Sequence, residues 1–206
     1  MKKILFTLLL CLPLLSFAGK RDDTKYLRGA VPERDGLVTF TQTFSVPGKS
    51  QADIYPVMQS FVRNLVANGR QDLRTRVISD ENNTIVANVE EIMTFRKKFL
   101  NWDHCYFRYL ISAECTAQDK VVLTVTKISY YYMFDNEGKG GETFKAEEWI
   151  SDAAAVNKAN TRLYPRSGKF RRKTVDRVEE IFGAALEVFE QPKQPEPEKP
   201  KAAVVE

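Results

Sequence analysis

The residue types that most often carry catalysis are sparse in this chain. It contains one histidine, His104, which directly follows Asp103. One histidine cannot build a multi-histidine metal site. As a general base it would need a nucleophile within hydrogen-bonding reach, and no such neighbour can be read from the sequence. We therefore interpret His104 as a capping or hydrogen-bonding residue at the start of a strand.

Two other patterns also fall short of an active site. Glu147 and Glu148 are adjacent, so they are not spaced to share one helix face as a catalytic carboxylate pair, and we interpret them as solvated or ion-paired. The glycine-rich turn at residues 135–142 lacks the strand–loop–helix layout of a phosphate-binding loop. We expect no enzyme activity, no metal site and no cofactor.

The two cysteines beyond the N-terminal leader, Cys105 and Cys115, invite a disulfide in an exported protein. If both lie on one continuous strand, the ten residues between them span about 33 Å. A disulfide requires Cα atoms within about 7 Å. We predict two free thiols that face the core.

The densest basic segment spans residues 158–173. Its cations are Lys158, Arg162, Arg166, Lys169, Arg171, Arg172 and Lys173. One interpretation is a basic loop that contacts an anionic group or a partner. The other, which we favour, is that these cations pair with the nearby acids Glu142, Glu147, Glu148 and Asp152 and hold a long loop against the sheet.

The element that must position these residues is a hairpin over residues 104–134 with its turn at residues 117–120. Its first strand alternates apolar and polar side chains, with Cys105, Phe107, Tyr109, Ile111, Ala113 and Cys115 on one face. In its second strand the apolar phase changes from odd to even positions. One extra residue produces that change, so we predict a β-bulge at Thr126–Lys127.

Before this hairpin, alternation predicts a strand over residues 38–46 and a helix over residues 50–68. Either Ser50 or Asp53 can cap the helix, and Pro56 is easier to accommodate with Asp53 as the cap. A further hairpin turns at Asn82-Asn83. In its second strand the alternation places Glu91 on the apolar face. Glu91 is either a functional carboxylate there, or a bulge or register slip moves it off that face; we favour the bulge or register slip.

After the central hairpin we expect a short helix over residues 151–158 and a loop over residues 164–168. The last helix is then capped by Thr174 and runs to about Glu190. Together the elements predict an α+β fold, a two-layer sandwich with an antiparallel sheet of about five strands in the order β-α-β-β-β-β-α and the helices on one face. The expected domain covers residues 26–190, after a flexible segment at 19–25 and before a disordered Pro/Glu/Lys-rich tail at 191–206.

Residues 1–18 match a secretion signal, with Lys2-Lys3 before an apolar run and a cleavage site between Ala18 and Gly19. The whole chain has 31 Lys and Arg against 27 Asp and Glu, and removal of the two leader lysines leaves an excess of only two. We expect a periplasmic or outer-envelope protein with no transmembrane segment after cleavage. So small a net charge predicts no general attraction to nucleic acid.

Several short motifs, together with the element order, resemble a bacterial family described as a domain of unknown function with a TBP-like fold. The matching motifs are Tyr26-Leu27, Gly29-Ala30-Val31-Pro32, Gly36 to Phe40, Val46-Pro47-Gly48-Lys49-Ser50, Ile54-Tyr55, Lys145-Ala146-Glu147-Glu148-Trp149-Ile150, Asp152, Asn157-Lys158, Leu163-Tyr164, Ser167-Gly168-Lys169-Phe170-Arg171 and Lys173-Thr174-Val175-Asp176. The resemblance implies a curved sheet and export from the cytoplasm. It implies no activity, and fold alone does not carry function.

Two functional hypotheses remain. The first is a non-catalytic interaction module that contacts an unknown envelope protein or small ligand through the polar sheet face or the 158–173 segment. That face offers Arg108, Ser112, Glu114, Thr116 and Thr124, a mixture of charges unlike a nucleic-acid footprint. The alternative is a carrier of a small apolar ligand between helix and sheet, lined by Phe61, Tyr109, Tyr130 and Tyr132.

Overall fold

The computed structural model describes residues 22–99, 101–117, 119–133 and 140–190. The predicted signal peptide, its cleavage site at Ala18–Gly19, the tail from residue 191 and Phe134 lie outside these residues.

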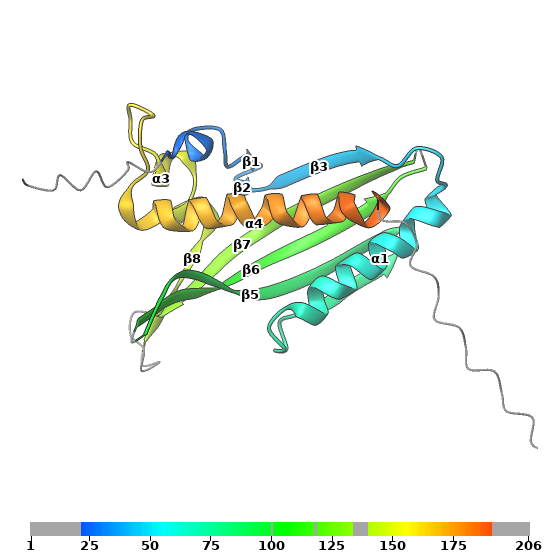
Figure 1. Ribbon diagram of the computed structural model, residues 1–206, viewed down its shortest axis with the longest axis horizontal. Coiled ribbons are helices and arrows are strands. Elements are labelled where there is room, and N and C mark those ends of the chain that lie inside the picture. Colours follow the sequence, from blue (N-terminus) through cyan, green and yellow to red (C-terminus); the bar gives the residue numbers. More distant parts are fainter. Residues whose placement is uncertain (1–21, 100, 118, 134–139, 191–206) are drawn as a thin grey trace, which may run out of the picture.

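A long antiparallel sheet forms one layer of the molecule (Figure 1). Five strands follow the order β3-β7-β6-β5-β4, and a sixth, β8, pairs with β7. Their bounds are β3 Phe40–Ser45, β4 Arg76–Glu81, β5 Thr84–Lys98, β6 Asn101–Cys115, β7 Lys120–Met133 and β8 Gly141–Lys145, with a separate small pair of β1 Glu33–Arg34 and β2 Leu37–Val38. The predicted two-layer α+β fold is confirmed, and β8, β1 and β2 are additions to the predicted strands.

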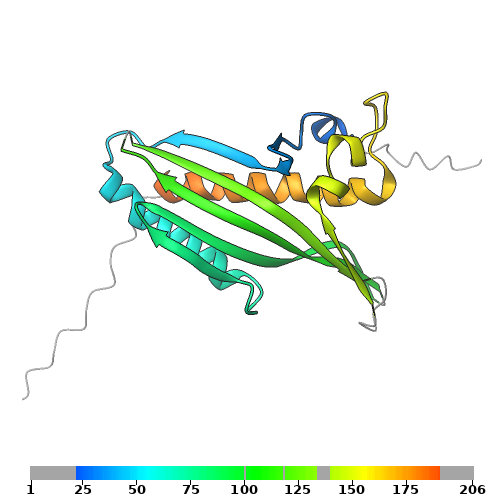
Figure 2. The ribbon, with the colours of Figure 1, turned by 180° about the vertical axis from the view of Figure 1, so that it is seen from behind.

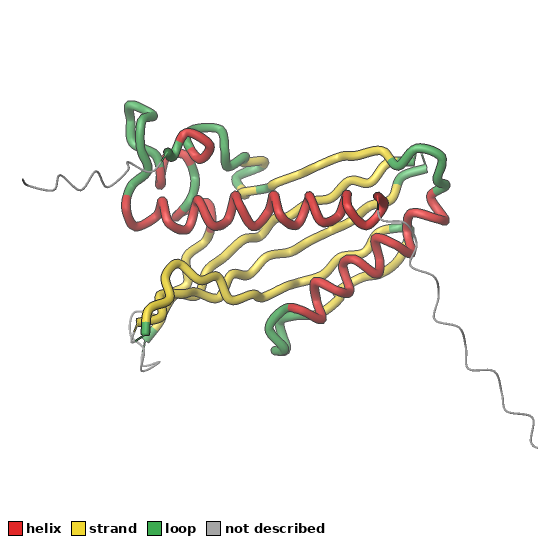
Figure 3. The backbone as a smooth tube through the Cα atoms, in the orientation of Figure 1, coloured by secondary structure: helices red, strands yellow, loops and turns green. Residues whose placement is uncertain are grey.

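Two helices form the second layer. α1 Gln51–Asn68 and α4 Pro165–Glu190 lie on the same face of the sheet and diverge from one end of it (Figures 1 and 3). The short elements η1 Thr24–Tyr26, α2 Ala146–Trp149 and α3 Asp152–Ala155 gather near the start of α4. Seen from behind, the strands lie in front of the helices, so the other face of the sheet is uncovered (Figure 2). We call these the core face and the outer face.

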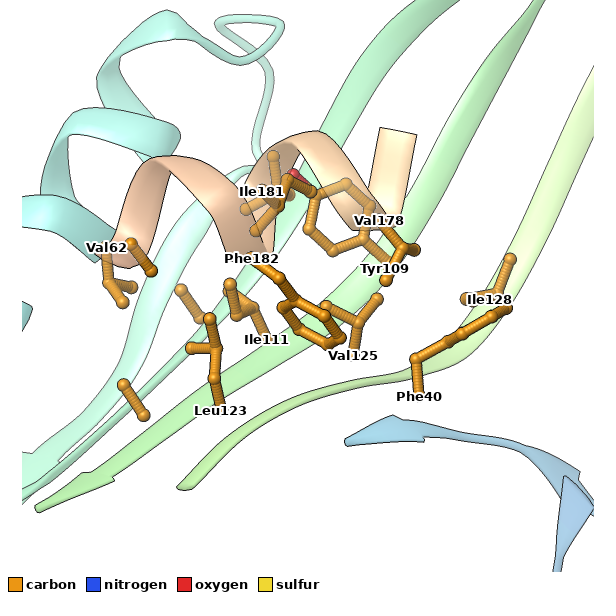
Figure 4. Close-up of a cluster of buried hydrophobic side chains, with 14 of the residues drawn as sticks. Phe40, Val62, Tyr109, Ile111, Leu123, Val125, Ile128, Val178, Ile181 and Phe182 are labelled. Carbon is orange, nitrogen blue, oxygen red and sulfur yellow. The ribbon is translucent and has the colours of Figure 1, made fainter. Parts of the chain in front are cut away.

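The core lies between the helices and the core face. Phe182 and Ile181 of α4 and Val62 of α1 pack on side chains such as Ile111 and Leu123 of the sheet (Figure 4). The predicted alternation along β6 is confirmed, because its odd-numbered residues from 105 to 115 are all buried. Cys105 and Cys115 are buried free thiols, and burial raises the pKa of Cys115 to about 11.

The predicted bulge in β7 is confirmed. Arg108 pairs with Ser129 and Leu110 pairs with Thr126, so one residue of β6 lies opposite two residues of β7. Lys127 adopts a left-handed conformation with φ of 51°. The hairpin turn at Asn82-Asn83 is confirmed as well, with φ of 54° and 56°.

The bulge expected near Glu91 is wrong. β5 pairs with β6 without interruption from Thr84 to Thr94, and the register shifts only between Thr94 and Arg96. Glu91 therefore lies on the core face, opposite Phe107. The carboxylate is tolerated there because two side chains bind it, as described below.

Ser50 is the cap of α1. Its hydroxyl accepts from the Asp53 N–H at 3.3 Å, and the Asp53 carboxylate accepts from the Ser50 N–H at 3.1 Å. Pro56 therefore lies inside the helix and removes one hydrogen bond, yet α1 continues to Asn68.

The last helix begins at Pro165, so the predicted loop at 164–168 and the predicted cap at Thr174 are both wrong. Proline is favoured at the first helical position because its missing N–H needs no partner there. Gly168 lets the helix approach Leu163, from which an added Cβ would lie only 2.7 Å away. Thr174 is buried inside the helix and hydrogen-bonds the Tyr130 hydroxyl at 2.7 Å. The short helix α3 ends at Ala155 rather than at residue 158.

Candidate functional site

The predicted basic segment does not form one loop surface. Lys158 and Arg162 precede α4 and are exposed, as is Arg166 in its first turn. Lys169 turns toward the sheet and binds Asp103 at 2.8 Å and the Tyr132 hydroxyl at 3.1 Å. The segment is divided because a helix sends successive residues in different directions.

Arg171 and Arg172 attach the N-terminal segment to α4. The Arg171 side chain is fully buried and donates to the carbonyls of Tyr26, Leu27 and Ile150 at 2.6–2.7 Å. It also binds Asp152 at 2.6 Å. Arg172 binds Asp23 at 2.9 Å. These contacts give Arg171 a structural role.

The expected acidic partners are only partly correct. Among the four acids predicted to pair with the basic segment, Asp152 does so through Arg171. Glu147 instead accepts from the Val38 N–H at 2.7 Å, which joins α2 to β2. Residues 22–25, expected in a flexible segment, are tied to the fold, because Lys25 binds Asp176 at 2.8 Å.

His104 lies beside the aromatic ring of Trp102 near the start of β6. The ring centroids are 4.0 Å apart, and His104 Nδ1 is 3.0 Å from the Trp102 carbonyl oxygen. This contact fits the hydrogen-bonding role expected for His104. Asp103, its neighbour in sequence, binds Lys169 rather than the imidazole.

The four aromatic residues proposed to line an apolar pocket do not share one cavity in the described structure. Tyr130 packs against Phe107 and Phe170 at centroid distances of 5.8 Å and 5.1 Å. The hydroxyls of Tyr109, Tyr130 and Tyr132 each bind a protein group, and Phe61 lies on α1 beside a separate shallow hollow with Pro56. These rings fill the core instead of enclosing a ligand space.

A cleft of about 590 Å³ lies between α4 and β5. Its walls include Glu91 of β5 and a row of charged α4 side chains. The Arg177 guanidinium binds Glu91 through two contacts of 2.8 Å and 3.0 Å, and the Tyr109 hydroxyl donates to the same carboxylate at 2.6 Å. Burial and the nearby Glu91 charge hold the pKa of Tyr109 well above its usual range. Most charges in this cleft thus bind one another.

The outer face holds a buried carboxylate, Glu90, with only 1% of its side chain exposed. Arg70 donates to one of its oxygens and Arg108 to the other, while Arg74 lies 3.8 Å away. The loop before β4 brings two of these arginines to the sheet edge, because the Arg70 N–H donates to the Glu90 carbonyl at 2.7 Å. We call Glu90, Arg70, Arg74 and Arg108 the Glu90 cluster.

Aromatic rings border the Glu90 cluster. The Arg70 guanidinium lies 4.0 Å from the centroid of the Tyr106 ring, and that of Arg108 lies 5.5 Å from the centroid of Tyr131. The two tyrosines face each other across β6 and β7 with their rings nearly parallel. These contacts restrict the arginine side chains on the outer face.

Next to the Glu90 cluster is a hollow of about 380 Å³, which we call the outer-face hollow. It is lined by Leu73, Arg74, Arg76, Asn88, Val89, Glu90, Arg108, Tyr109, Lys127 and Ser129. Four of these residues are cations and one is an acid. The polar phase of β6 identified Arg108, and the change of apolar phase in β7 located Lys127 as a bulge residue. Nothing in the sequence placed Arg74 and Arg76 beside them.

Within the described ranges, no group of three or more His, Cys, Asp and Glu side chains is arranged to hold a metal ion. Each helix in the described part of the chain is too short or too polar to cross a membrane.

Comparisons with known proteins identify the relatives of this chain. The family model of a domain of unknown function (DUF4468) with TBP-like fold matches residues 40–131. A crystal structure of a DUF4468 family protein from Bacteroides ovatus is 36% identical, with a TM-score of 0.75, and the match covers 85% of this chain and 100% of that one. A TBP-like protein from Parabacteroides distasonis shares the fold at 18% identity, with a TM-score of 0.65 and coverage of 80% and 99%.

A search of curated proteins finds no match. The family match, the identity to the Bacteroides ovatus protein and the shared sheet-and-helix architecture lead to one conclusion: the chain belongs to the DUF4468 family, whose members have a TBP-like fold.

Proposed function

We propose that this protein is an exported, non-catalytic binding module of the cell envelope, and that it recognises a negatively charged envelope component with the outer face of its sheet. The observation that carries the proposal is the excess of cations around the outer-face hollow, where Arg74, Arg76, Arg108 and Lys127 meet the single carboxylate of Glu90. Such an arrangement complements an anionic partner.

The other surfaces support a binding role less well. The core face is covered by α1 and α4, and its aromatic residues pack against one another. The cations of the 158–173 segment are spread over different directions, and Lys169, Arg171 and Arg172 are bound to protein groups. A small-molecule carrier would need an enclosed apolar space, whereas the cleft between α4 and β5 is bordered by charged residues.

Export is tested by producing the full chain in a Gram-negative host, fractionating the cells and measuring the mass of the mature protein. We expect periplasmic or envelope material that begins at Gly19. A chain that keeps its first 18 residues and stays in the cytoplasm would contradict this part of the proposal.

Recognition is tested by capture from solubilised envelope with the immobilised mature chain. The outer-face variant carries Arg74→Gln, Arg76→Gln and Lys127→Asn. The matched control carries Lys158→Gln, Arg162→Gln and Arg166→Gln, which removes the same number of exposed charges elsewhere. We expect the control to retain an anionic component that the outer-face variant loses. Equal capture by all three proteins, or loss only with the control, would overturn the proposal.

A further inference from the structure

We infer that the outer-face hollow is a binding site for a tetrahedral oxyanion, a phosphate or sulfate group on a larger molecule. This inference rests on the proposed function and names the chemistry that its recognition surface takes. Four observations lead to it: the convergence of cations, their incomplete neutralisation, the supply of neutral donors, and the size of the hollow.

The cations reach the hollow from separate parts of the chain. Arg74 precedes β4, Arg76 begins β4, Arg108 lies in β6 and Lys127 lies in β7. The sheet register brings them together, because Arg76 pairs with Asn88, Glu90 pairs with Arg108 and Arg108 pairs with Ser129. The site is therefore built on adjacent strands, which hold its groups more firmly than a flexible loop would.

Glu90 neutralises only part of this charge. Its two oxygens accept from Arg70 and from Arg108 Nε, while Arg74 stays at 3.8 Å. A second carboxylate, Asp72, lies 3.7 Å from Arg70, which is not among the cations that line the hollow. Arg76 donates to the Leu73 carbonyl at 3.0 Å, which orients the guanidinium without changing its charge. Lys127 makes no ion pair with any described residue. A second anion would therefore meet several cations whose charges are not balanced.

The bulge in β7 supplies Lys127. A regular strand would place residues alternately on the two faces, but the extra residue at this point lies exposed between Thr126 of the outer face and buried Ile128. Arginine forks bind two oxygens of a phosphate or sulfate at once, whereas a lysine ammonium acts as a point charge. The set of Arg74, Arg76, Arg108 and Lys127 offers both kinds of contact.

Neutral groups complete the hollow. Asn88 and Ser129 offer an amide and a hydroxyl, and the exposed Leu73 offers apolar surface. A volume of about 380 Å³ lies in the range of sites that hold an organic molecule, so the anion would be one group of a larger ligand.

The inference is tested by calorimetric titration of the mature chain with inorganic phosphate, inorganic sulfate and phosphoethanolamine, with ethanolamine as the control that lacks the phosphate group. A parallel arm measures cosedimentation with phosphatidylcholine vesicles that do or do not contain phosphatidic acid. Binding of the soluble anions identifies a free ligand, and binding only to phosphatidic acid vesicles identifies a lipid headgroup. In either case added salt weakens the binding.

The double variant Arg76→Gln/Lys127→Asn should weaken anion binding by about tenfold or more, because each lost contact is a charged hydrogen bond. It leaves the Glu90 cluster intact, and asparagine tolerates the left-handed conformation at position 127. The matched control Arg162→Gln/Arg166→Gln should bind like the unmodified chain. Circular dichroism verifies that both variants fold.

The inference is overturned if no anion and no phosphatidic acid vesicle binds, if ethanolamine binds as well as phosphoethanolamine, or if both variants weaken binding equally. These outcomes can be told apart from a failure of the proposed function. If envelope capture still depends on the outer face while every phosphate and sulfate probe fails, the face binds a partner of other chemistry. If capture does not depend on the face, the proposed function itself fails.

Discussion

Two neighbouring carboxylates, Glu90 and Glu91, show how the two faces of the sheet differ. Both lie in β5, and alternation sends them to opposite faces. On the core face, Glu91 is bound by one arginine, Arg177, and one hydroxyl, that of Tyr109. On the outer face, Glu90 is surrounded by Arg70, Arg74 and Arg108, with further cations beside it.

The difference separates charges that hold the fold from charges that can bind a ligand. Arg171 forms an ion pair with Asp152, and Glu91 forms one with Arg177, so the charges of both residues are balanced within the protein. The three arginines of the Glu90 cluster outnumber the two carboxylates near them, Glu90 and Asp72, which lies 3.7 Å from Arg70. A mismatch of this kind at an uncovered surface is the expected property of an anion site.

The largest effect is expected at Arg171. Arg171→Met should lower the free energy of unfolding by about 3–5 kcal/mol, because Asp152 and three backbone carbonyls lose their buried donor. Denaturant unfolding of the mature chain measures this loss. Arg172→Met, which removes a more exposed ion pair, is the control and should cost clearly less. Equal losses would show that burial of Arg171 does not decide its contribution.

Glu91→Gln should lower the free energy of unfolding by about 1.5–3 kcal/mol, since the bidentate contact with Arg177 and the acceptor of the Tyr109 hydroxyl are both weakened. Thermal and denaturant unfolding measure the change, and Glu187→Gln on the exposed side of α4 controls for the loss of charge. A neutral result would remove the distinction between the two faces.

Glu90→Gln should cost a similar amount, about 1.5–3 kcal/mol, because it weakens the contacts of a buried carboxylate with two arginines. Glu90 is more deeply buried than Glu91, and the arginine partners of the two acids are exposed to a similar degree, with 35% of Arg70 and 22% of Arg108 accessible to water against 33% of Arg177. Inorganic phosphate should then raise the melting temperature of the variant more than that of the unmodified chain. A negligible loss would show that Glu90 does not stabilise the fold despite its burial.

Asp80 gives a smaller, pH-dependent effect on the core face. It accepts from Tyr55, Arg63 and Gln59 of α1, and the hydrogen bond from Tyr55, followed by those from Arg63 and Gln59, holds its pKa below the ordinary value of 3.8 despite partial desolvation. Because the folded pKa is the lower one, this stabilisation is complete above 3.8 and is lost as the pH falls through the folded pKa.

The measurement for Asp80 is a series of denaturant curves from neutral pH to below 3.8 for the unmodified chain and for Asp80→Asn. The variant should begin less stable and lose less stability on acidification. Parallel curves for the two proteins would show that Asp80 does not contribute to the acid sensitivity.

The smallest effect is expected at Lys127. Lys127→Gly should raise the free energy of unfolding by about 0.5–1 kcal/mol, because glycine adopts the φ of 51° without the strain of a side chain. Lys127→Asn, which also tolerates this conformation, should fall between the two. A loss of stability with glycine would show that the lysine side chain itself stabilises the bulge.

Local patterns in the sequence determined most of the fold. Alternation along β6 placed Cys105 and Cys115 in the core as free thiols, and the change of apolar phase in β7 located the bulge at Lys127. The Asn82-Asn83 turn and the apolar stripes of the helices followed from the same reasoning, because backbone periodicity and turn chemistry are local properties. The family motifs were also sufficient to indicate the shared fold.

Only the tertiary structure decided which charges meet. The basic residues from 158 to 173 looked like one surface, but α4 begins at Pro165 and sends Lys169, Arg171 and Arg172 to separate partners. Glu91 looked misplaced until Arg177, 86 positions away in sequence, was found beside it. The outer-face hollow likewise joins Arg74, Arg108 and Lys127. Side-chain pairing between distant segments depends on strand register and helix placement, which no short stretch of sequence encodes.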